Sequence, residues 1–159
     1  EEAKATHQTN LLEYEAYQIL EKTLEEAEVE VSRHLTEPIR NILSVTLPRL
    51  TAGRYSHVNL DDTLEVQSIR YNALDVDPAD LSTGAKGQLA LALRLALVDH
   101  LSGKERQMIV LDDALVNFDG DRLEEAKKLL AETSVHHQVL YLTCHAEAAE
   151  FAGYVLHRL

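Results

Sequence analysis

The segment that most constrains this chain is a polar, glycine-bearing stretch, Leu81 to Gln88, that leads directly into the apolar run Leu89 to Leu97. This pattern predicts a buried helix that begins near Ser82. The backbone N–H groups of a first helical turn have no intrahelical partner and carry about half a positive charge, so they attract phosphate oxygens. Ser82 adds a hydroxyl group, and Gly84 lets an oxyanion approach the backbone closely. We therefore predict a phosphate-facing helix N-terminus here.

Two short apolar stretches further along the chain are predicted to be strands that end in polar residues. The first, Met108 to Asp113, ends in a pair of aspartates, and the second, Val139 to His145, ends in threonine, cysteine and histidine. The loop Ala114 to Asp119 and a helical pattern over Leu123 to Leu130 lie between them. Because open α/β sheets bind ligands at the carboxyl ends of their strands, the sequence predicts a ligand site at these two ends.

These segments, in this order, resemble the C-terminal lobe of an ABC-type ATPase head of the SMC and SbcC class, in particular the YhaN-like bacterial ATPases. Leu81, Ser82 and Gly84 match the LSGGQ signature, in which Thr83 replaces the first glycine and Ala85 the glutamine. The other matches are the Walker B strand at Met108 to Asp112, the catalytic acid at Asp113, the D-loop at Val116 to Asp119 and the switch histidine at His145.

The resemblance implies that the ligands are ATP and Mg²⁺. Asp112 would hold Mg²⁺, an ion that keeps most of its waters and needs only one or two carboxylates beside a phosphate. Asp113, which stands where most of the family have glutamate, would orient or deprotonate the attacking water, and His145 would contact the terminal phosphate. The residues expected to bind the nucleotide are Ser82, Thr83, Gly84, Lys86, Asn117 and Asp119. By pattern alone, turn residues at a strand end are a minority interpretation of Asp112 and Asp113, whereas a solvated or core-satisfied side chain is the usual interpretation of a histidine such as His145.

The N-terminal third of the chain has the pattern of an amphipathic helix, with apolar residues three and four apart from Leu12 to Leu35. Pro38 is predicted to break or kink this helix, and Thr36 to cap a second one that stops before Pro48. By pattern alone, a two-helix hairpin explains these residues equally well. The resemblance favours the returning strand of an antiparallel coiled coil that enters the head at Leu50 to Tyr55.

The expected fold class is α/β: the C-terminal half of an ABC-type P-loop ATPase head, with a mixed sheet flanked by helices and an N-terminal coiled-coil stub. We divide the chain into the stub and the helix that enters the head, residues 1–50, and a C-terminal ATPase lobe, residues 51–159. Further elements are predicted within the lobe. They are a hairpin of Tyr55 to Leu60 and Thr63 to Tyr71 around Asp61-Asp62, a linker at Asp77 to Asp80, a short helix at Ala146 to Phe151 and a closing strand at Gly153 to Leu159.

The composition excludes several classes of protein. The 15 Lys and Arg against 27 Asp and Glu give a net charge of −12, which argues against a chain that coats nucleic acid over its whole surface. The longest apolar run, Leu89 to Val98, is interrupted by Arg94 and is too short to span a membrane. Arg94 itself is a candidate for coupling nucleotide binding to the signature helix, by resemblance to related repair ATPases. The single cysteine, Cys144, excludes an internal disulfide and fits a reducing cytoplasm.

One motif that the nucleotide site requires is absent from the sequence. The phosphate-cradling loop G-x-x-x-x-G-K-[ST] does not occur, and Gly103-Lys104 is only a fragment of it. We therefore expect an N-terminal Walker A lobe that was removed or is supplied as another polypeptide. The chain alone is expected neither to bind ATP tightly nor to hydrolyse it.

The resemblance also implies partners, because the signature of one head caps the ATP held by a second head. We therefore expect a homodimer of heads in a nucleoid-associated, cytoplasmic DNA repair or chromosome-maintenance ATPase that acts on double-stranded DNA. A metallophosphoesterase nuclease is a further candidate partner. The alternative is a non-catalytic scaffold that dimerises and tethers DNA or partners with vestigial hydrolysis, which Asp113 and Thr83 favour. A transporter subunit is disfavoured because such chains lack a long coiled coil.

Overall fold

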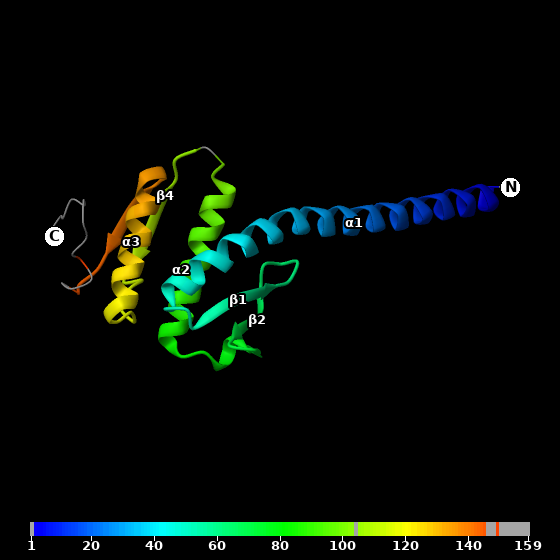
Figure 1. Ribbon diagram of the computed structural model, residues 1–159. Coiled ribbons are helices and arrows are strands. Elements are labelled where there is room, and N and C mark those ends of the chain that lie inside the picture. The colour runs from blue at the N-terminus through cyan, green and yellow to red at the C-terminus, as the bar shows by residue number, and fades with distance from the viewer. Residues whose placement is uncertain (1, 104, 146–148, 150–159) are drawn as a thin grey trace.

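A single long helix, α1, precedes a lobe of α-helices and two small sheets (Figure 1). The computed structural model describes residues 2–103, 105–145 and 149. The elements are α1 (Glu2–Leu50), β1 (Tyr55–Leu60), β2 (Val66–Tyr71), β3 (Leu74–Val76), the 3₁₀ helix η1 (Pro78–Asp80), α2 (Thr83–Leu101), β4 (Met108–Asp112), α3 (Gly120–His136) and β5 (Gln138–Leu142). The α/β class is confirmed. Apart from Ala149, the short helix and closing strand expected after residue 145 lie outside the described residues.

Helix α1 continues through both of its prolines, so Pro38 does not break the helix, and the predictions of a cap at Thr36 and of a stop before Pro48 are wrong. A proline inside a helix costs about 3 kcal/mol. One face of the C-terminal third of α1 is fully buried, and burial of each large aliphatic side chain contributes about 1.5–3 kcal/mol. The side chains on this face are 0–1% exposed: Ile39, Leu43, Leu47 and Leu50. This burial offsets the cost of the prolines, and Thr36 is itself buried.

The N-terminal part of α1 projects away from the lobe (Figure 1). Its large apolar side chains are exposed, among them Leu12 at 64%, Ile19 at 67% and Leu24 at 61%. These side chains are those that define the amphipathic pattern. The apolar stripe of this projection is therefore covered by nothing in the described part of the chain.

The strands after α1 form an antiparallel sheet in the order β1-β2-β3. The predicted hairpin is confirmed, but β2 begins at Val66 rather than at Thr63. The reason is the carboxylate of Asp61, whose Oδ1 accepts hydrogen bonds from the N–H groups of Thr63 and Glu65, both at 2.9 Å. These bonds hold the segment as a turn and lower the pKa of Asp61, mainly through a further bond from the hydroxyl of Thr63. Strand β3 is too short to show a period in the sequence.

The remaining strands, β4 and β5, pair in parallel in a separate two-stranded sheet. One face of this sheet carries Ile109 and Leu111, which are buried, and α3 packs beside it (Figure 1). The opposite face is apolar yet exposed. Its residues and their exposed fractions are Met108 63%, Val110 48%, Leu140 44% and Leu142 41%. Helix α2 packs against α1, and no helix among the described residues is long and apolar enough to cross a membrane.

Candidate functional site

The two parallel strands deliver polar side chains to one edge of their sheet. Asp112 at the end of β4 pairs with Leu142 at the end of β5, so the residues that follow both strands emerge side by side. The N–H group of Asp113 donates to the carbonyl oxygen of Leu142 at 2.9 Å, which extends the pairing by one residue. The ligand atoms of Asp113, Cys144 and His145 all lie within 4.8 Å of one another. The structure thus brings together the two residues for which the sequence predicted catalytic roles.

Thr143 connects these two residues. Its Oγ1 donates a hydrogen bond to Oδ1 of Asp113 at 2.8 Å and accepts one from the N–H group of His145 at 3.1 Å. Asp113 has a φ of 45°, in the left-handed region that few residues other than glycine adopt. Thr143 therefore fixes the direction of the Asp113 carboxylate and the backbone at His145. The sequence predicts that Thr143 lies at a strand end but indicates no role for it.

The predicted magnesium ligand, Asp112, is exposed at the carboxyl end of β4. Its carboxylate is open to a cation and its waters, which suits the hydrated coordination that Mg²⁺ prefers. Because Asp112 and Asp113 are consecutive residues, a cation held at Asp112 would lie near the Asp113–Thr143–His145 cluster.

The predicted helix start at Ser82 is confirmed, because Ser82 is the N-cap of α2. Its Oγ accepts from the N–H group of Ala85 at 3.3 Å, a long and therefore weak capping bond. Ser82 and Thr83 are exposed. The ammonium group of Lys86 donates to the carbonyl oxygen of Ala79 at 2.8 Å, so it is directed towards η1. The hydroxyl groups at this helix N-terminus are accessible to a ligand from outside the chain.

The predicted D-loop segment, Val116 to Asp119, lies against the start of α2. A Cβ atom built on Gly84 would lie 3.0 Å from the carbonyl oxygen of Asn117. Phe118 is buried, which anchors the loop, whereas Asn117 and Asp119 are exposed. The carboxylate of Asp119 does not cap α3 and instead pairs with Arg122, with 3.1 Å between Oδ1 and Nε.

Four of the predicted site residues therefore meet in two pairs. Asp113 and His145 meet at the strand ends, and Gly84 meets Asn117 where α2 begins. Lys86 instead bonds to Ala79 in η1, and Asp119 pairs with Arg122 in α3. Arg94 is exposed on α2, so it needs no buried ion-pair partner.

Comparison with known proteins finds relatives that are similar over part of the chain. Over 98 residues the chain is 34% identical to the "Uncharacterized protein YhaN" of Bacillus subtilis, and over 103 residues it is 30% identical to the "DNA double-strand break repair Rad50 ATPase" of Methanocaldococcus jannaschii. The alignments cover 60% and 64% of this chain. The chain spans only 10% of the length of either relative. No protein-family model matches it.

A solved structure described as "Structural biochemistry of ATP-driven dimerization and DNA stimulated activation of SMC ATPases" shares the fold. Its TM-score is 0.60 at 17% identity, and the match covers 75% of this chain and 74% of that one. In sequence and in fold, the chain is therefore similar to the head region of SMC/SbcC-like ATPases. ATPases of this kind use nucleotide and Mg²⁺, and their general activity is ATP hydrolysis.

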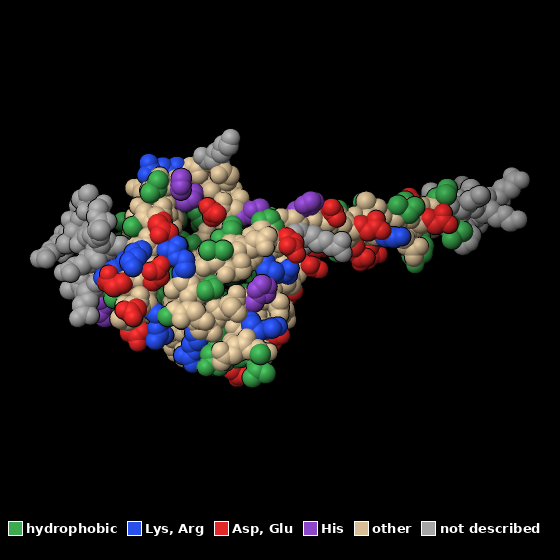
Figure 2. Space-filling model, viewed as in Figure 1, with side chains coloured by type: hydrophobic (Ala, Val, Ile, Leu, Met, Phe, Trp, Pro, Cys, Tyr) green, Lys and Arg blue, Asp and Glu red, His purple; other side chains and the backbone are tan. Residues whose placement is uncertain are grey.

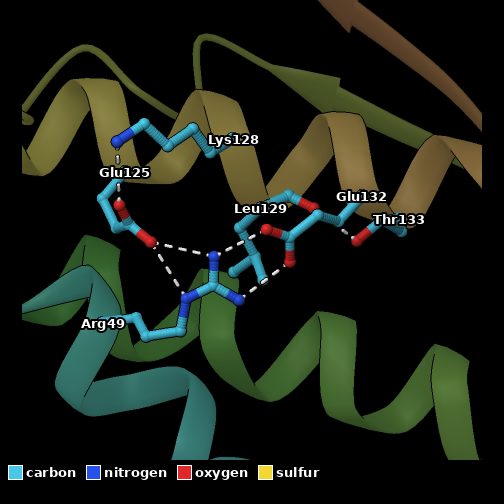
Figure 3. Close-up of polar contacts among 6 residues, drawn as sticks. All are labelled: Arg49, Glu125, Lys128, Leu129, Glu132 and Thr133. Carbon is cyan, nitrogen blue, oxygen red and sulfur yellow. Dashed lines mark hydrogen bonds and ion pairs between the residues drawn. The ribbon is translucent and has the colours of Figure 1, made fainter.

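Within the head region, an arginine clamp joins the long helix to the lobe (Figure 3). Arg49, in the last turn of α1, donates to Oε1 of Glu125 at 2.8 and 2.9 Å and to both carboxylate oxygens of Glu132 at 2.8 and 2.9 Å. The hydrogen bonds that Arg49 donates lower the pKa of both glutamates, and the same bonds, first the one to Glu132, raise the pKa of Arg49. Both glutamates are on α3, the helix that follows the D-loop. The clamp thus ties α1 to the element next to the predicted site.

Proposed function

We propose that this chain is the C-terminal lobe of an ATP-binding and ATP-hydrolysing head in a DNA repair or chromosome-maintenance ATPase. Residues 1–50 would be the coiled-coil stub and the helix that enters the head, and residues 51–159 the ATPase lobe. The observation that carries the proposal is the Asp113–Thr143–His145 cluster at the ends of two parallel strands. Strand ends of this kind are where α/β sheets place their ligands.

The proposed chemistry needs positioned groups more than covalent catalysis. Phosphoryl transfer is accelerated by an oriented nucleophile and by charges placed around the transferred group. Thr143 holds the carboxylate of Asp113 in one orientation. A residue that orients or deprotonates the attacking water needs such a fixed orientation. His145, exposed beside it, can donate a ring N–H to a terminal phosphate. Asp112 would hold Mg²⁺ next to that phosphate.

The exposed face of the β4–β5 sheet supports a Walker A lobe as a partner. Four apolar side chains on this face are 41–63% exposed, and a two-stranded sheet is not stable with one apolar face in water. An N-terminal lobe that continues this sheet would cover them and would bring the phosphate-cradling loop to the strand ends. The chain on its own would then lack the phosphate-binding half of the site.

The exposed α2 N-terminus supports a second head as the other partner. Ser82 and Thr83 are accessible, and the helix dipole favours an anion there. In the proposed dimer this surface would cap the ATP held by the opposite head, with Lys86, Asn117 and Asp119 at its border. ATP-driven dimerisation is named for the structurally similar SMC ATPase, which agrees with this arrangement.

Double-stranded DNA is the proposed substrate of the assembly, in the cytoplasm and at the nucleoid, with a metallophosphoesterase nuclease as an additional partner. The name of the Rad50 relative supports the choice of DNA. On the face shown in Figure 2, basic and acidic side chains are interspersed over the lobe, and the projecting helix carries mainly acidic ones. With a net charge of −12, the chain would therefore contact DNA only locally, and most of the contact would be made by the Walker A lobe.

The test is ATP turnover by the complete head, in which this lobe is joined to a Walker A lobe. Asp113→Asn should abolish turnover while ATP remains bound and the head dimer lives longer. Asp112→Asn should instead weaken binding of the Mg²⁺–nucleotide complex. Asp121→Asn is the matched control, because Asp121 is an exposed acid outside the cluster, and should change neither. Unchanged turnover in both site variants would show that the Walker B assignment is wrong. ATP-dependent dimerisation without any turnover in the wild type would favour the scaffold.

A further inference from the structure

We propose that Asp113, Cys144 and His145 form a site for a thiophilic divalent cation, best matched by Zn²⁺, and that its occupation stops ATP hydrolysis. The proposal that a metal binds here depends only on the geometry of these three residues. The inhibition rests on the proposed function, since it requires that Asp113 and His145 act on ATP.

The three side chains supply one carboxylate oxygen, one thiol sulfur and one imidazole nitrogen. All three ligand atoms lie within 4.8 Å of one another, and Sγ of Cys144 is 3.9 Å from Oδ2 of Asp113. Ligands of a tetrahedral zinc ion lie about 3.5 Å apart, given metal–ligand bonds of about 2.0–2.3 Å. Cys144 and His145 are exposed, so rotation of their side chains closes the remaining gap without movement of the core. The fourth position is open to water.

The surroundings of the cluster resemble the supporting contacts of a metal centre. Carboxylates that bind metals are themselves held by hydrogen bonds, and loss of such a partner typically costs about 10- to 100-fold in metal affinity. Thr143 donates such a hydrogen bond to Oδ1 of Asp113. The other carboxylate oxygen, Oδ2, faces Cys144 and receives no hydrogen bond from Thr143. The same hydroxyl oxygen accepts from the backbone N–H group of His145, which fixes the backbone from which the third ligand projects. One threonine therefore orients the carboxylate of one ligand and the backbone of another.

The nature of the ligands selects the metal. Mg²⁺ prefers six oxygen ligands, most of them waters, whereas a thiolate and an imidazole favour Zn²⁺ and its spectroscopic substitute Co²⁺. The site is therefore distinct in chemistry from the proposed magnesium ligand Asp112. A zinc ion here would occupy both the carboxylate that orients water and the imidazole that contacts phosphate. Hydrolysis would stop although the magnesium ligand stayed free.

The binding test is a titration of the full 159-residue chain, under reducing conditions, with Co²⁺ followed by Zn²⁺. Because Cys144 is the sole cysteine, a thiolate-to-cobalt charge-transfer band can arise only from this residue. We expect one metal per chain, displacement of Co²⁺ by Zn²⁺, and loss of the band in Cys144→Ser. Affinity should fall about tenfold or more in His145→Ala, Asp113→Asn and Thr143→Val. His136→Gln is the matched control, since His136 is an exposed histidine outside the cluster, and should bind as the wild type does.

The absence of a charge-transfer band, a band unaffected by His145→Ala, or one metal bridging two chains would each overturn the site. The inhibition is tested separately in the complete head, as the ratio of ATPase activity with and without Zn²⁺. This ratio should be far below one in the wild type and close to one in Cys144→Ser. If the chain bound the metal but the head was not inhibited, the metal site would be supported. Its proposed overlap with the catalytic residues would be refuted.

Discussion

Gly84, in the first turn of α2, lies so close to Asn117 that a Cβ atom on Gly84 would be 3.0 Å from the carbonyl oxygen of Asn117. This distance is tighter than ordinary van der Waals contact, so the two backbones meet because Gly84 has no side chain. The contact joins the predicted signature segment to the predicted D-loop segment. A residue expected to admit a phosphate oxygen thus also admits a carbonyl oxygen of its own chain.

Gly84→Ala should therefore shift the D-loop by a few tenths of an ångström. In an ordinary helical position, Gly→Ala stabilises by about 0.5–1 kcal/mol. Gly87, on the same helix, offers the matched control, because its added Cβ would meet Phe118 only at 3.8 Å. We expect Gly87→Ala to gain this stability and Gly84→Ala to gain less or to lose some, measured by urea unfolding. Equal gains in both variants would show that the close approach has no energetic consequence.

Thr143→Val should lower the turnover of the complete head about 10- to 100-fold with little change in KM for ATP. The substitution keeps the shape of the side chain but removes the donor to Asp113, so the carboxylate loses its fixed direction, and misplaced groups cost rate. Thr143→Ser keeps the hydroxyl and should restore most of the activity. Thr133→Val is the control, because the Thr133 hydroxyl bonds to Leu129 within α3. Steady-state kinetics that found Thr143→Val and Thr133→Val alike would refute the positioning role.

Ser82→Arg should abolish ATP-induced dimerisation of heads while nucleotide binding by a single head stays nearly intact. The bulky cation would stand where the α2 N-terminus of its own head must meet the γ-phosphate held by the opposite head. Light scattering and nucleotide titration on one sample separate the two effects. Ser82→Ala reports the capping role alone, and loss of the 3.3 Å cap should cost at most about 1 kcal/mol. A Ser82→Arg protein that melts earlier but still dimerises with ATP would show that Ser82 is only a cap.

Arg49→Met should destabilise the lobe by about 1 kcal/mol at pH 7, because it removes the clamp between α1 and α3 while keeping most of the side-chain stem. The expected loss is small because the clamp is partly exposed: the Glu132 side chain is 58% exposed, and solvent weakens its ion pair with Arg49. Arg70→Met, which breaks an exposed pair with Asp75 inside one sheet, should cost less. Thermal unfolding of the two variants gives the comparison.

The same clamp should make stability depend on acid pH. The pKa values of Glu125 and Glu132 lie below their ordinary value of 4.5, so the folded state binds these protons less readily than the unfolded state. Their contribution is therefore full above the ordinary pKa and is lost as the pH falls through the lowered values. Between about pH 5 and pH 3, the wild type should lose more unfolding free energy than Arg49→Met. Parallel pH profiles for the two proteins would contradict this prediction.

Local patterns were sufficient to predict most elements of the lobe. The start of α2 at Ser82, the hairpin and the parallel strands with polar ends were all expected from residue order and periodicity. These features depend on neighbours within a few residues: a serine cap before an apolar run, alternation in strands, or polar residues after a buried strand. The motif order also predicted the SMC/SbcC-like class.

Tertiary packing decided the features that local rules predicted wrongly or did not address. Pro38 remains inside α1 because Ile39 and its helix neighbours are buried against the lobe, a gain that helix propensity does not include. The Arg49–Glu125 pair joins residues 76 positions apart.

By itself, the sequence therefore determined the class of the protein and the identity of its candidate site residues, because caps, strand periods and motifs are encoded within a few residues. Only the tertiary structure decided that Thr143 holds Asp113 and that Gly84 meets Asn117. Such contacts form only when strand pairing and helix packing bring distant segments within hydrogen-bond or van der Waals distance.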